Sequence, residues 1–178
     1  MVNKSTRPTA GWAPSLWRDT FVELLDDELE HGDDWFLNFN YTLTDKISEE
    51  EKKRGLKVFQ SHTHGKFQCQ SCRRFWSSAH VSLVFHYRLR KKRGIAVMRP
   101  FGQACLDCKG RFSLPVFSKD DVEKVLLKLF SKIRKNIYGE RDEVDEAPPS
   151  EKVFTKPHVS ELCEACQTQG TCSQRDDP

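Results

Sequence analysis

The spacing of apolar positions predicts two amphipathic helices. The first helix is predicted to start at Ser15, a candidate cap, and to stop at Gly32. Its other faces are acidic, and its apolar positions, which recur at helical spacing, are Trp17, Phe21, Leu24, Leu25 and Leu29. We expect this stripe to pack on the rest of the domain, because such stripes usually pack within their own chain; the alternative is a detached helix that binds a partner.

The second helix is predicted to begin after Ser118, which forms a weak capping box with Asp121, and to end at Gly139. Basic residues near its end suit the negative end of the helix dipole. Its apolar face consists of Val122, Val125, Leu126, Leu129, Phe130, Ile133 and Ile137.

Alternation with a period of two predicts β-strands between the helices. Residues 35–42 have one aromatic-rich face, and residues 79–90 have one apolar face made of Val81, Leu83, Phe85, Tyr87 and Leu89. Residues 91–94 read as a turn and residues 95–99 as the return strand of a hairpin. The charged residues 44–56 predict a solvated loop or a short helix, and apolar character resumes only briefly at Val58 and Phe59.

Composition and punctuation divide the chain into four parts. Residues 1–14 carry two prolines and a glycine and are expected to form a flexible arm, followed by a helix and a central domain over residues 15–139. Residues 140–157 are acidic, contain proline and lack a periodic apolar face, so they read as a linker. Residues 158–178 form a C-terminal cysteine-containing segment.

The number and context of the cysteines favour metal over disulfides. Seven cysteines among 178 residues cannot form a complete internal disulfide framework, and the polar N-terminus shows no secretory signal. A reducing, cytosolic environment is therefore expected. With only 37% hydrophobic residues, the domain has a modest core that bound metal would supplement. The longest apolar run, residues 79–87, is far too short to span a membrane.

Two Cys-x-x-Cys knuckles flank the predicted hairpin, as in a structural zinc site. Cys69 and Cys72 precede it, and Cys105 and Cys108 follow it. Each knuckle offers two thiolates from one tight turn, and together they supply the four ligands that tetrahedral zinc takes. His62 and His64 lie just before the first knuckle, but four cysteines already complete the site.

A second cluster contains His158, Cys163, Cys166 and Cys172. One imidazole and three thiolates make a closed zinc site, and the seven cysteines with this histidine give eight ligands, which is enough for two Zn²⁺ ions. Other partitions of the ligands between the two sites stay open. So does a C-terminal segment without metal, with free, lipidated or oxidised cysteines.

The sequence predicts no enzyme and no small-molecule substrate. Four-ligand zinc sites are closed and lack the open position that catalysis needs, and nothing else assembles a nucleophile, a base and an oxyanion site. A thioredoxin-like role needs a βαβ context that these knuckles do not have. The fold class expected from all these patterns is α+β, with a zinc-ribbon-like antiparallel β-hairpin or sheet core, flanking amphipathic helices and stabilisation by metal.

The predicted hairpin turn is strongly basic. Arg73 and Arg74 are expected nearby. The candidate contacts for an anionic partner are the cations Arg88, Arg90, Lys91, Lys92 and Arg93. Such a patch could bind RNA phosphates or anionic lipid headgroups. The alternative is a solvated turn that only protects a sheet edge. His86 falls on the polar face of its strand and reads as a surface residue.

These motifs resemble the receptor-transporting proteins with their 3CxxC-type zinc finger. The resemblance runs from about Trp17 to Cys172 and rests on three knuckles in order, each with characteristic neighbours. The matching stretches are Trp17-x3-Phe21-x-Glu23-Leu24, residues 67–72 followed by Trp76-Ser77-Ser78-Ala79, residues 99–105, and Pro157-His158 followed by Cys163-Glu164-Ala165-Cys166, Gly170 and Cys172.

The resemblance implies an accessory protein that binds G-protein-coupled receptors of the odorant or taste type and promotes their passage to the cell surface. One branch of the family is linked to antiviral responses, with RNA binding suggested. Members usually carry a C-terminal membrane anchor, whereas the sequence to Pro178 contains none; the anchor is either naturally absent or missing from an incomplete sequence. A cytoplasmic protein at the cytosolic face of membranes is expected. The candidate receptor contacts are Phe75, Trp76, Phe101 and Phe112. Each of them is expected to be a buried core residue, with receptor contact as the alternative.

Overall fold

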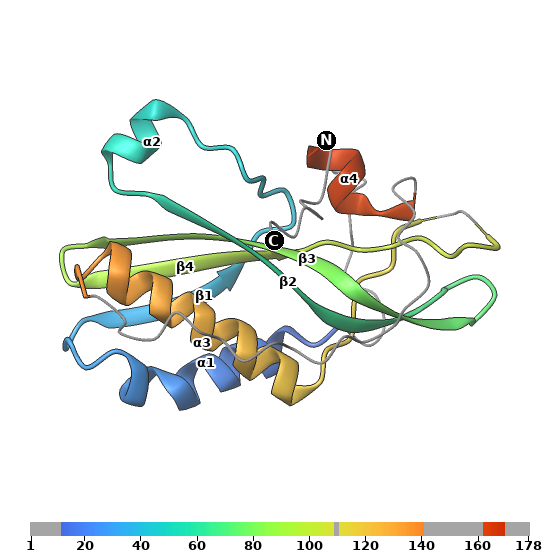
Figure 1. Cartoon of the computed structure of the whole chain (residues 1–178), viewed down its shortest axis with the longest axis horizontal. Coiled ribbons are helices and arrows are strands. Elements are labelled where there is room, and N and C mark those ends of the chain that lie inside the picture. Colours follow the sequence, from blue (N-terminus) through green and yellow to red (C-terminus); the bar gives the residue numbers. More distant parts are fainter. Residues whose placement is uncertain (1–11, 109–110, 141–161, 170–178) are drawn as a thin grey trace, which may run out of the picture.

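Four strands and four helices build the part of the chain that the computed structural model describes, residues 12–108, 111–140 and 162–169. The sheet has the strand order β1-β4-β3-β2, with α1 and α3 on one face and α2 and α4 on the other side (Figure 1). In chain order the elements are α1 Pro14–Glu28, β1 Asp34–Phe39, α2 Glu49–Lys53, β2 Lys57–Gln68, β3 Phe75–Arg90, β4 Arg93–Pro100, α3 Lys119–Asn136 and α4 Glu164–Gln169.

The α+β class is confirmed, but the sheet is mixed and not purely antiparallel. β3 pairs antiparallel with both β2 and β4, and the β3–β4 hairpin is the predicted one. β1 instead runs parallel to β4, from Asp34 beside Arg93 to Phe39 beside Met98. Parallel neighbours need a long connection, and here α2, β2 and β3 all lie between the two strands in the sequence.

The long strand β2 was not predicted, because it is mostly polar. Its alternation supplies few apolar residues to the core, although it pairs with β3 from Lys57 beside Tyr87 to Gln68 beside Phe75. A bulge interrupts this pairing. Thr63 pairs with Val81 and Gly65 with Ser78, so β3 has one residue more than β2 between these two pairs. Beyond the bulge, the side chains of β3 therefore alternate between the two faces of the sheet in the opposite phase.

The main core lies between the sheet and the helices α1 and α3. The predicted stripe of α1 packs within the chain, with the rings of Phe21 and Phe130 5.0 Å apart and those of Trp17 and Phe117 5.2 Å apart. The predicted face of α3 is buried at Val122, Val125, Leu126, Leu129, Phe130 and Ile133. These aromatic and aliphatic contacts join both helices to one face of the sheet.

The caps of α3 are confirmed and those of α1 are not. Ser118 Oγ accepts a hydrogen bond from the backbone N–H of Asp121 at 3.2 Å, and Gly139 adopts a left-handed φ of +69° just after α3. α1 begins instead after Ala13, with Pro14 in its first turn and no side-chain cap, so Ser15 does not cap it. It ends at Glu28, before Gly32.

Trp12 belongs to the core, although the sequence assigns it to the N-terminal arm. It is buried, its ring packs edge-on against Phe39 at 5.7 Å and Phe117 at 6.2 Å, and its indole N–H donates to Tyr41 Oη at 2.8 Å. Residues 1–11 of the arm and residues 141–157 of the linker lie outside the described residues.

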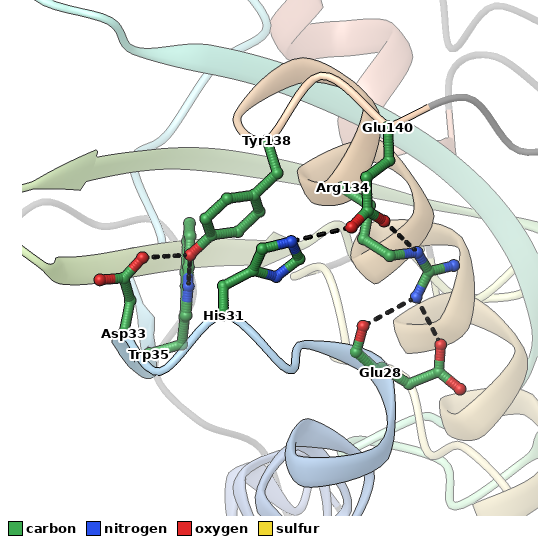
Figure 2. Close-up of polar contacts among 7 residues, drawn as sticks. All are labelled: Glu28, His31, Asp33, Trp35, Arg134, Tyr138 and Glu140. Carbon is green, nitrogen blue, oxygen red and sulfur yellow. Dashed lines mark hydrogen bonds and ion pairs between the residues drawn. The ribbon is translucent and has the colours of Figure 1, made fainter.

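Near the β3–β4 turn, β1 is fixed to α3 through Tyr138 (Figure 2). Tyr138 Oη donates to Asp33 Oδ2 at 2.7 Å and accepts from Trp35 Nε1 at 3.0 Å. The Trp35 ring occupies the space beside Gly94, where an added Cβ would lie 2.1 Å from it. His31 stacks on the Tyr138 ring at 3.6 Å.

The same network continues along α3 to the end of α1 (Figure 2). His31 Nε2 lies 2.8 Å from Glu140 Oε1. Arg134 Nη1 donates to the backbone carbonyl of Glu28 at 3.0 Å and to its carboxylate at 2.6 Å. The last turns of both helices are thereby tied together. No helix in the described ranges is both long and apolar enough to cross a membrane.

Candidate metal centre

The first two cysteine knuckles meet at the end of the sheet opposite the β3–β4 turn. Cys69 and Cys72 form the turn between β2 and β3, closed by a hydrogen bond from Cys69 N to Arg74 O at 2.8 Å. The second knuckle follows β4. Gln103 just before it accepts from Trp76 Nε1 at 3.1 Å and donates to Ser78 Oγ at 2.9 Å.

The four cysteines of the predicted first site come together. The sulfurs of Cys69, Cys72, Cys105 and Cys108 all lie within 4.8 Å of one another, and the Cys72 and Cys105 sulfurs are 3.7 Å apart. Tetrahedral zinc with Zn–S bonds of about 2.3 Å places its sulfurs about 3.8 Å apart. The residues therefore fit one zinc ion, and a set of four thiolates leaves no open position for catalysis.

The thiols of this cluster influence one another. The backbone N–H of Cys72 is the main cause that lowers the pKa of Cys69 to about 6, while hydrogen bonds with the Cys72 and Cys69 thiols raise the pKa of Cys108 to about 12. A divalent cation would favour all four thiolates and release their protons. Across the two knuckles, Arg74 Nη1 bonds Asp107 Oδ2 at 2.5 Å.

The third knuckle docks beside this centre at the start of α4, a helix that the sequence did not predict. Cys163 pairs with Gln103 in an isolated bridge, and the backbone N–H of Ala104 donates to Leu162 O at 2.9 Å. Burial raises the pKa of the Cys163 thiol to about 11. His158 and Cys172, the other predicted ligands of the second site, lie outside the described residues, so only Cys163 and Cys166 indicate that site.

A buried ion pair that the sequence did not reveal joins the third knuckle to the sheet. Arg99 in β4 and Glu164 in α4 are each 4% exposed, and Arg99 Nη2 lies 3.4 Å from Glu164 Oε1. Arg99 Nη1 also donates to Leu43 O at 2.8 Å, and its guanidinium lies over the Phe101 ring at 4.3 Å. Both residues lie in stretches that match the 3CxxC pattern, residues 99–105 and Cys163-Glu164-Ala165-Cys166, but nothing in either stretch marks them as partners.

Burial dominates the electrostatics of this pair. It lowers the pKa of Arg99 and raises the pKa of Glu164, and each charge only partly offsets the effect on the other. The Glu164 carboxylate also accepts from the Gly102 N–H at 3.4 Å. The pair lies with Val84, Phe101 and Ala165 in a small second core on the face of the sheet away from α1 and α3.

The aromatic residues expected as core behave differently from one another. Phe101 is buried, and Trp76 stacks on Phe67 at 5.3 Å, as expected. Phe112 is half-buried. Phe75 is 72% exposed and is not a core residue, because the reset alternation at this end of β3 points it away from the helices. Leu106, inside the second knuckle, is 46% exposed, so the candidate metal centre carries two apolar side chains in solvent.

The basic turn lies far from the metal centre. Arg90, Lys91, Lys92 and Arg93 are exposed at the β3–β4 turn, and Arg88 is half-buried behind them. Arg73 and Arg74 come just before Phe75, at the opposite end of β3 and not near this turn, which corrects the expectation. β3 spans 16 residues, so the two groups are about 50 Å apart.

Two histidines have contacts away from the metal centre. His64 Nδ1 lies 3.8 Å from Asp121 Oδ2. His86 is half-buried, so it is not the simple surface residue that the sequence predicts. Its Nε2 lies 2.7 Å from Thr44 O, and this contact joins the segment before α2 to β3.

Comparison with known proteins agrees with this geometry. A family model described as a zinc-binding domain of the 3CxxC zinc-ribbon type matches residues 62–169. Mouse Receptor-transporting protein 4 is 35% identical over 167 residues, covering 89% of this chain and 65% of the relative. Mouse Receptor-transporting protein 3 is 33% identical over 90% of this chain and 34% of its own length. Human Receptor-transporting protein 4 is 32% identical over 89% of this chain and 64% of its own length.

The chain thus spans between about a third and two thirds of the length of these relatives. No solved structure is significantly similar to it. The matched region contains all three knuckles up to Cys166 and the assembled four-cysteine cluster. This chain belongs to the receptor-transporting proteins, built on a 3CxxC-type zinc-binding domain.

Proposed function

We propose that this protein is a zinc-stabilised accessory protein that binds G-protein-coupled receptors of the odorant or taste type and promotes their trafficking to the plasma membrane. It acts at the cytosolic face of membranes and catalyses no reaction. Cys69, Cys72, Cys105 and Cys108 bind one structural Zn²⁺. A second Zn²⁺ is bound by His158, Cys163, Cys166 and Cys172.

One observation carries the binding role. The four-cysteine cluster brings two loops together. Phe75, which begins β3 directly after the first loop, and Leu106, within the second, lie in solvent at 72% and 46% exposure. Because metal would fix the loops, little conformational entropy is lost when the two side chains are buried by a partner. Exposed aromatic side chains on a rigid base are typical of binding hot spots. The family relatives named for receptor transport suggest the kind of partner.

Replacing both apolar side chains tests this surface. The variant Phe75→Ala/Leu106→Ala is expected to retain its metal and melting temperature but to lose most co-precipitation with an odorant receptor, together with the gain in receptor at the cell surface. The matched control is Val22→Ala/Leu127→Ala, which removes exposed apolar side chains from α1 and α3. Unchanged receptor binding in the first variant would contradict the proposal.

Metal content tests the two-site assignment. Protein purified under reducing conditions is expected to contain two zinc ions per chain, and Cys163→Ser/Cys166→Ser is expected to contain one. A single zinc that the variant retains would remove the second site from the proposal.

RNA binding is the second candidate function, and the basic turn favours it. Four exposed cations stand together there, and the Arg93 guanidinium lies 5.0 Å from the ring centre of the exposed Phe36, a pairing suited to phosphates and bases. RNA binding through this turn should weaken steeply with salt and disappear when Arg90, Lys91, Lys92 and Arg93 are neutralised. Receptor binding through apolar contacts should survive both changes.

A further inference from the structure

A cavity of about 540 Å³ opens between the sheet and the segment that leads to α2. Its floor is formed by side chains of β3 and β4, and the loop after β1 and the end of α2 form its walls. This volume is in the range of ligand-binding sites. The apolar lining consists of Leu43, Leu56, Ile95 and Val97, and the uncharged polar lining of Asn40, Thr42 and Thr44.

The charged groups around this cavity are mainly basic. Lys46, Arg54 and Arg88 line it with His86, and Glu51 is the one carboxylate among the lining residues. None of the ion pairs within the described residues uses Lys46, Arg54 or Arg88. Three cations thus face one cavity without carboxylate partners, whereas Arg74, Arg99 and Arg134 all have such partners. A ligand with several negative charges would supply what the protein lacks.

The basic turn extends this charge beyond the cavity. Arg88 lies two residues before Arg90, on the same side of β3, so the cavity and the turn are continuous. Lys91 and Lys92 both adopt left-handed φ angles, +50° and +63°, at the two central positions of the turn. Asn-Gly is the favoured sequence for such a turn, so the two lysines cost stability there. Strain of this kind is concentrated at functional sites.

We propose that this cavity binds the phosphorylated headgroup of an anionic lipid, with the basic turn resting on the membrane surface beside it. Lys46, Arg54 and Arg88 would contact the phosphate groups inside the cavity. Lys91 and Lys92 would face the surrounding anionic lipids, whose attraction adds to that of a headgroup. This inference goes beyond the proposed receptor-binding surface, which lies at the other end of β3.

The shape of the site favours a headgroup over a nucleic-acid strand. Single-stranded nucleic acid needs a groove that follows the backbone, with several aromatic rings for its bases. Here the cavity has a limited volume, and no aromatic ring other than that of His86 lines it. A compact group with clustered phosphates matches the three cations better.

Two probes separate the cavity from the turn. The full chain is mixed with soluble inositol trisphosphate, followed by calorimetry, and with phosphatidylcholine vesicles that contain phosphatidylinositol bisphosphate, followed by sedimentation. Arg54→Gln/Arg88→Gln should weaken binding of both probes at least tenfold, because each lost charged hydrogen bond contributes about 1.5–3 kcal/mol. Lys91→Gln/Lys92→Gln should weaken vesicle binding and leave inositol trisphosphate binding unchanged.

Matched variants control for folding and for general charge. Lys124→Gln/Lys128→Gln removes two exposed cations from α3, on the other face of the sheet, and should change neither measurement. Glu51→Gln removes the single carboxylate of the lining and should tighten inositol trisphosphate binding two- to threefold, a gain that misfolding cannot produce.

Three results would overturn the proposal. One is the absence of inositol trisphosphate binding by the unchanged chain. Another is an equal loss in the α3 control, which would mean that binding follows net charge alone. The third is retention of single-stranded RNA in preference to both probes, with the same variants weakening it, which would assign the site to nucleic acid.

Discussion

At one end of β3 the chain is held by cysteine sulfurs, and at the other end by a network of side-chain hydrogen bonds around Tyr138. The metal end has one ion pair between its knuckles, Arg74 with Asp107, and leaves two apolar side chains in solvent. The turn end has a well-paired network on the helix side and unpaired cations on the other side. The two ends are about 50 Å apart.

This difference shows how a small core can support two separate surfaces. Metal holds loops rigid without needing many buried residues, which frees apolar side chains for a partner. The turn end lacks such a device and relies on Trp35, Tyr138 and the close approach at Gly94. Perturbing either end should therefore affect one surface and spare the other.

The largest effect is expected from breaking the metal end. Cys72→Ser/Cys105→Ser removes one sulfur from each knuckle, and structural zinc sites contribute on the order of 10 kcal/mol to folding of small domains. We expect loss of one zinc per chain and a fall in melting temperature of more than about 10 °C, measured by metal analysis and calorimetry. Ser71→Ala, an exposed change in the same turn, should alter neither; an unchanged melting temperature in the cysteine variant would refute a structural role for the metal.

A smaller but still large effect is expected from Glu164→Ala. The change leaves the Arg99 charge buried without its carboxylate partner, which costs about 3–5 kcal/mol. Chemical denaturation should show this loss, and hydrogen exchange should locate it at α4. The double variant Arg99→Met/Glu164→Leu should recover most of the stability, and failure of this recovery would mean that the ion pair itself is not the cause.

Tyr138→Phe tests the network at the turn end and should cost about 1–2 kcal/mol, because the Asp33 and Trp35 groups lose their shared partner. Burial and Asp33 raise the pKa of Tyr138 from 10.0 to about 12. The folded state thus holds the phenol proton more tightly than the unfolded state, so this stabilisation is complete below pH 10 and is lost between pH 10 and 12. Denaturation midpoints should fall more over this window in the unchanged chain than in the variant; parallel curves would contradict the assignment.

The smallest expected effect is a gain. Lys91→Asn/Lys92→Gly gives the turn the sequence that suits its left-handed backbone and should stabilise the chain by about 1 kcal/mol. The same change removes two cations, so a more stable protein should bind anionic vesicles less well. Thermal melting and vesicle sedimentation measure both outcomes, and a loss of stability would show that the lysines fit the turn better than its dihedral angles indicate.

The parts of the fold that sequence predicts are those with strong periodicity. In α1, α3 and the β3–β4 hairpin, most of the apolar positions that the pattern marks are buried and the others are half-buried, so periodicity predicts burial well there. β2 could not be predicted, because its place in the sheet depends on backbone pairing with β3 and few of its side chains are apolar. The parallel pairing of β1 with β4 leaves no local signal either.

The candidate site follows the same rule. The first four cysteines could be assigned because each knuckle is local and the two knuckles flank one hairpin. Arg99 and Glu164 are 65 positions apart, and nothing in either segment marks it as the partner of the other. The exposure of Phe75 depends on a bulge of one residue, which no pattern of apolar positions reveals.

The parallel pairing of β1 with β4 also sets an order of events during synthesis of the chain. Asp34 pairs with Arg93, and Phe39 with Met98, so β1 has no neighbour in the sheet until some sixty further residues have been made. Contacts between distant positions slow folding and leave early segments exposed in the meantime. While the ribosome completes β2, β3 and β4, the apolar side chains of β1 and of α1 remain exposed to solvent. This interval is when the nascent chain most needs the protection of a chaperone.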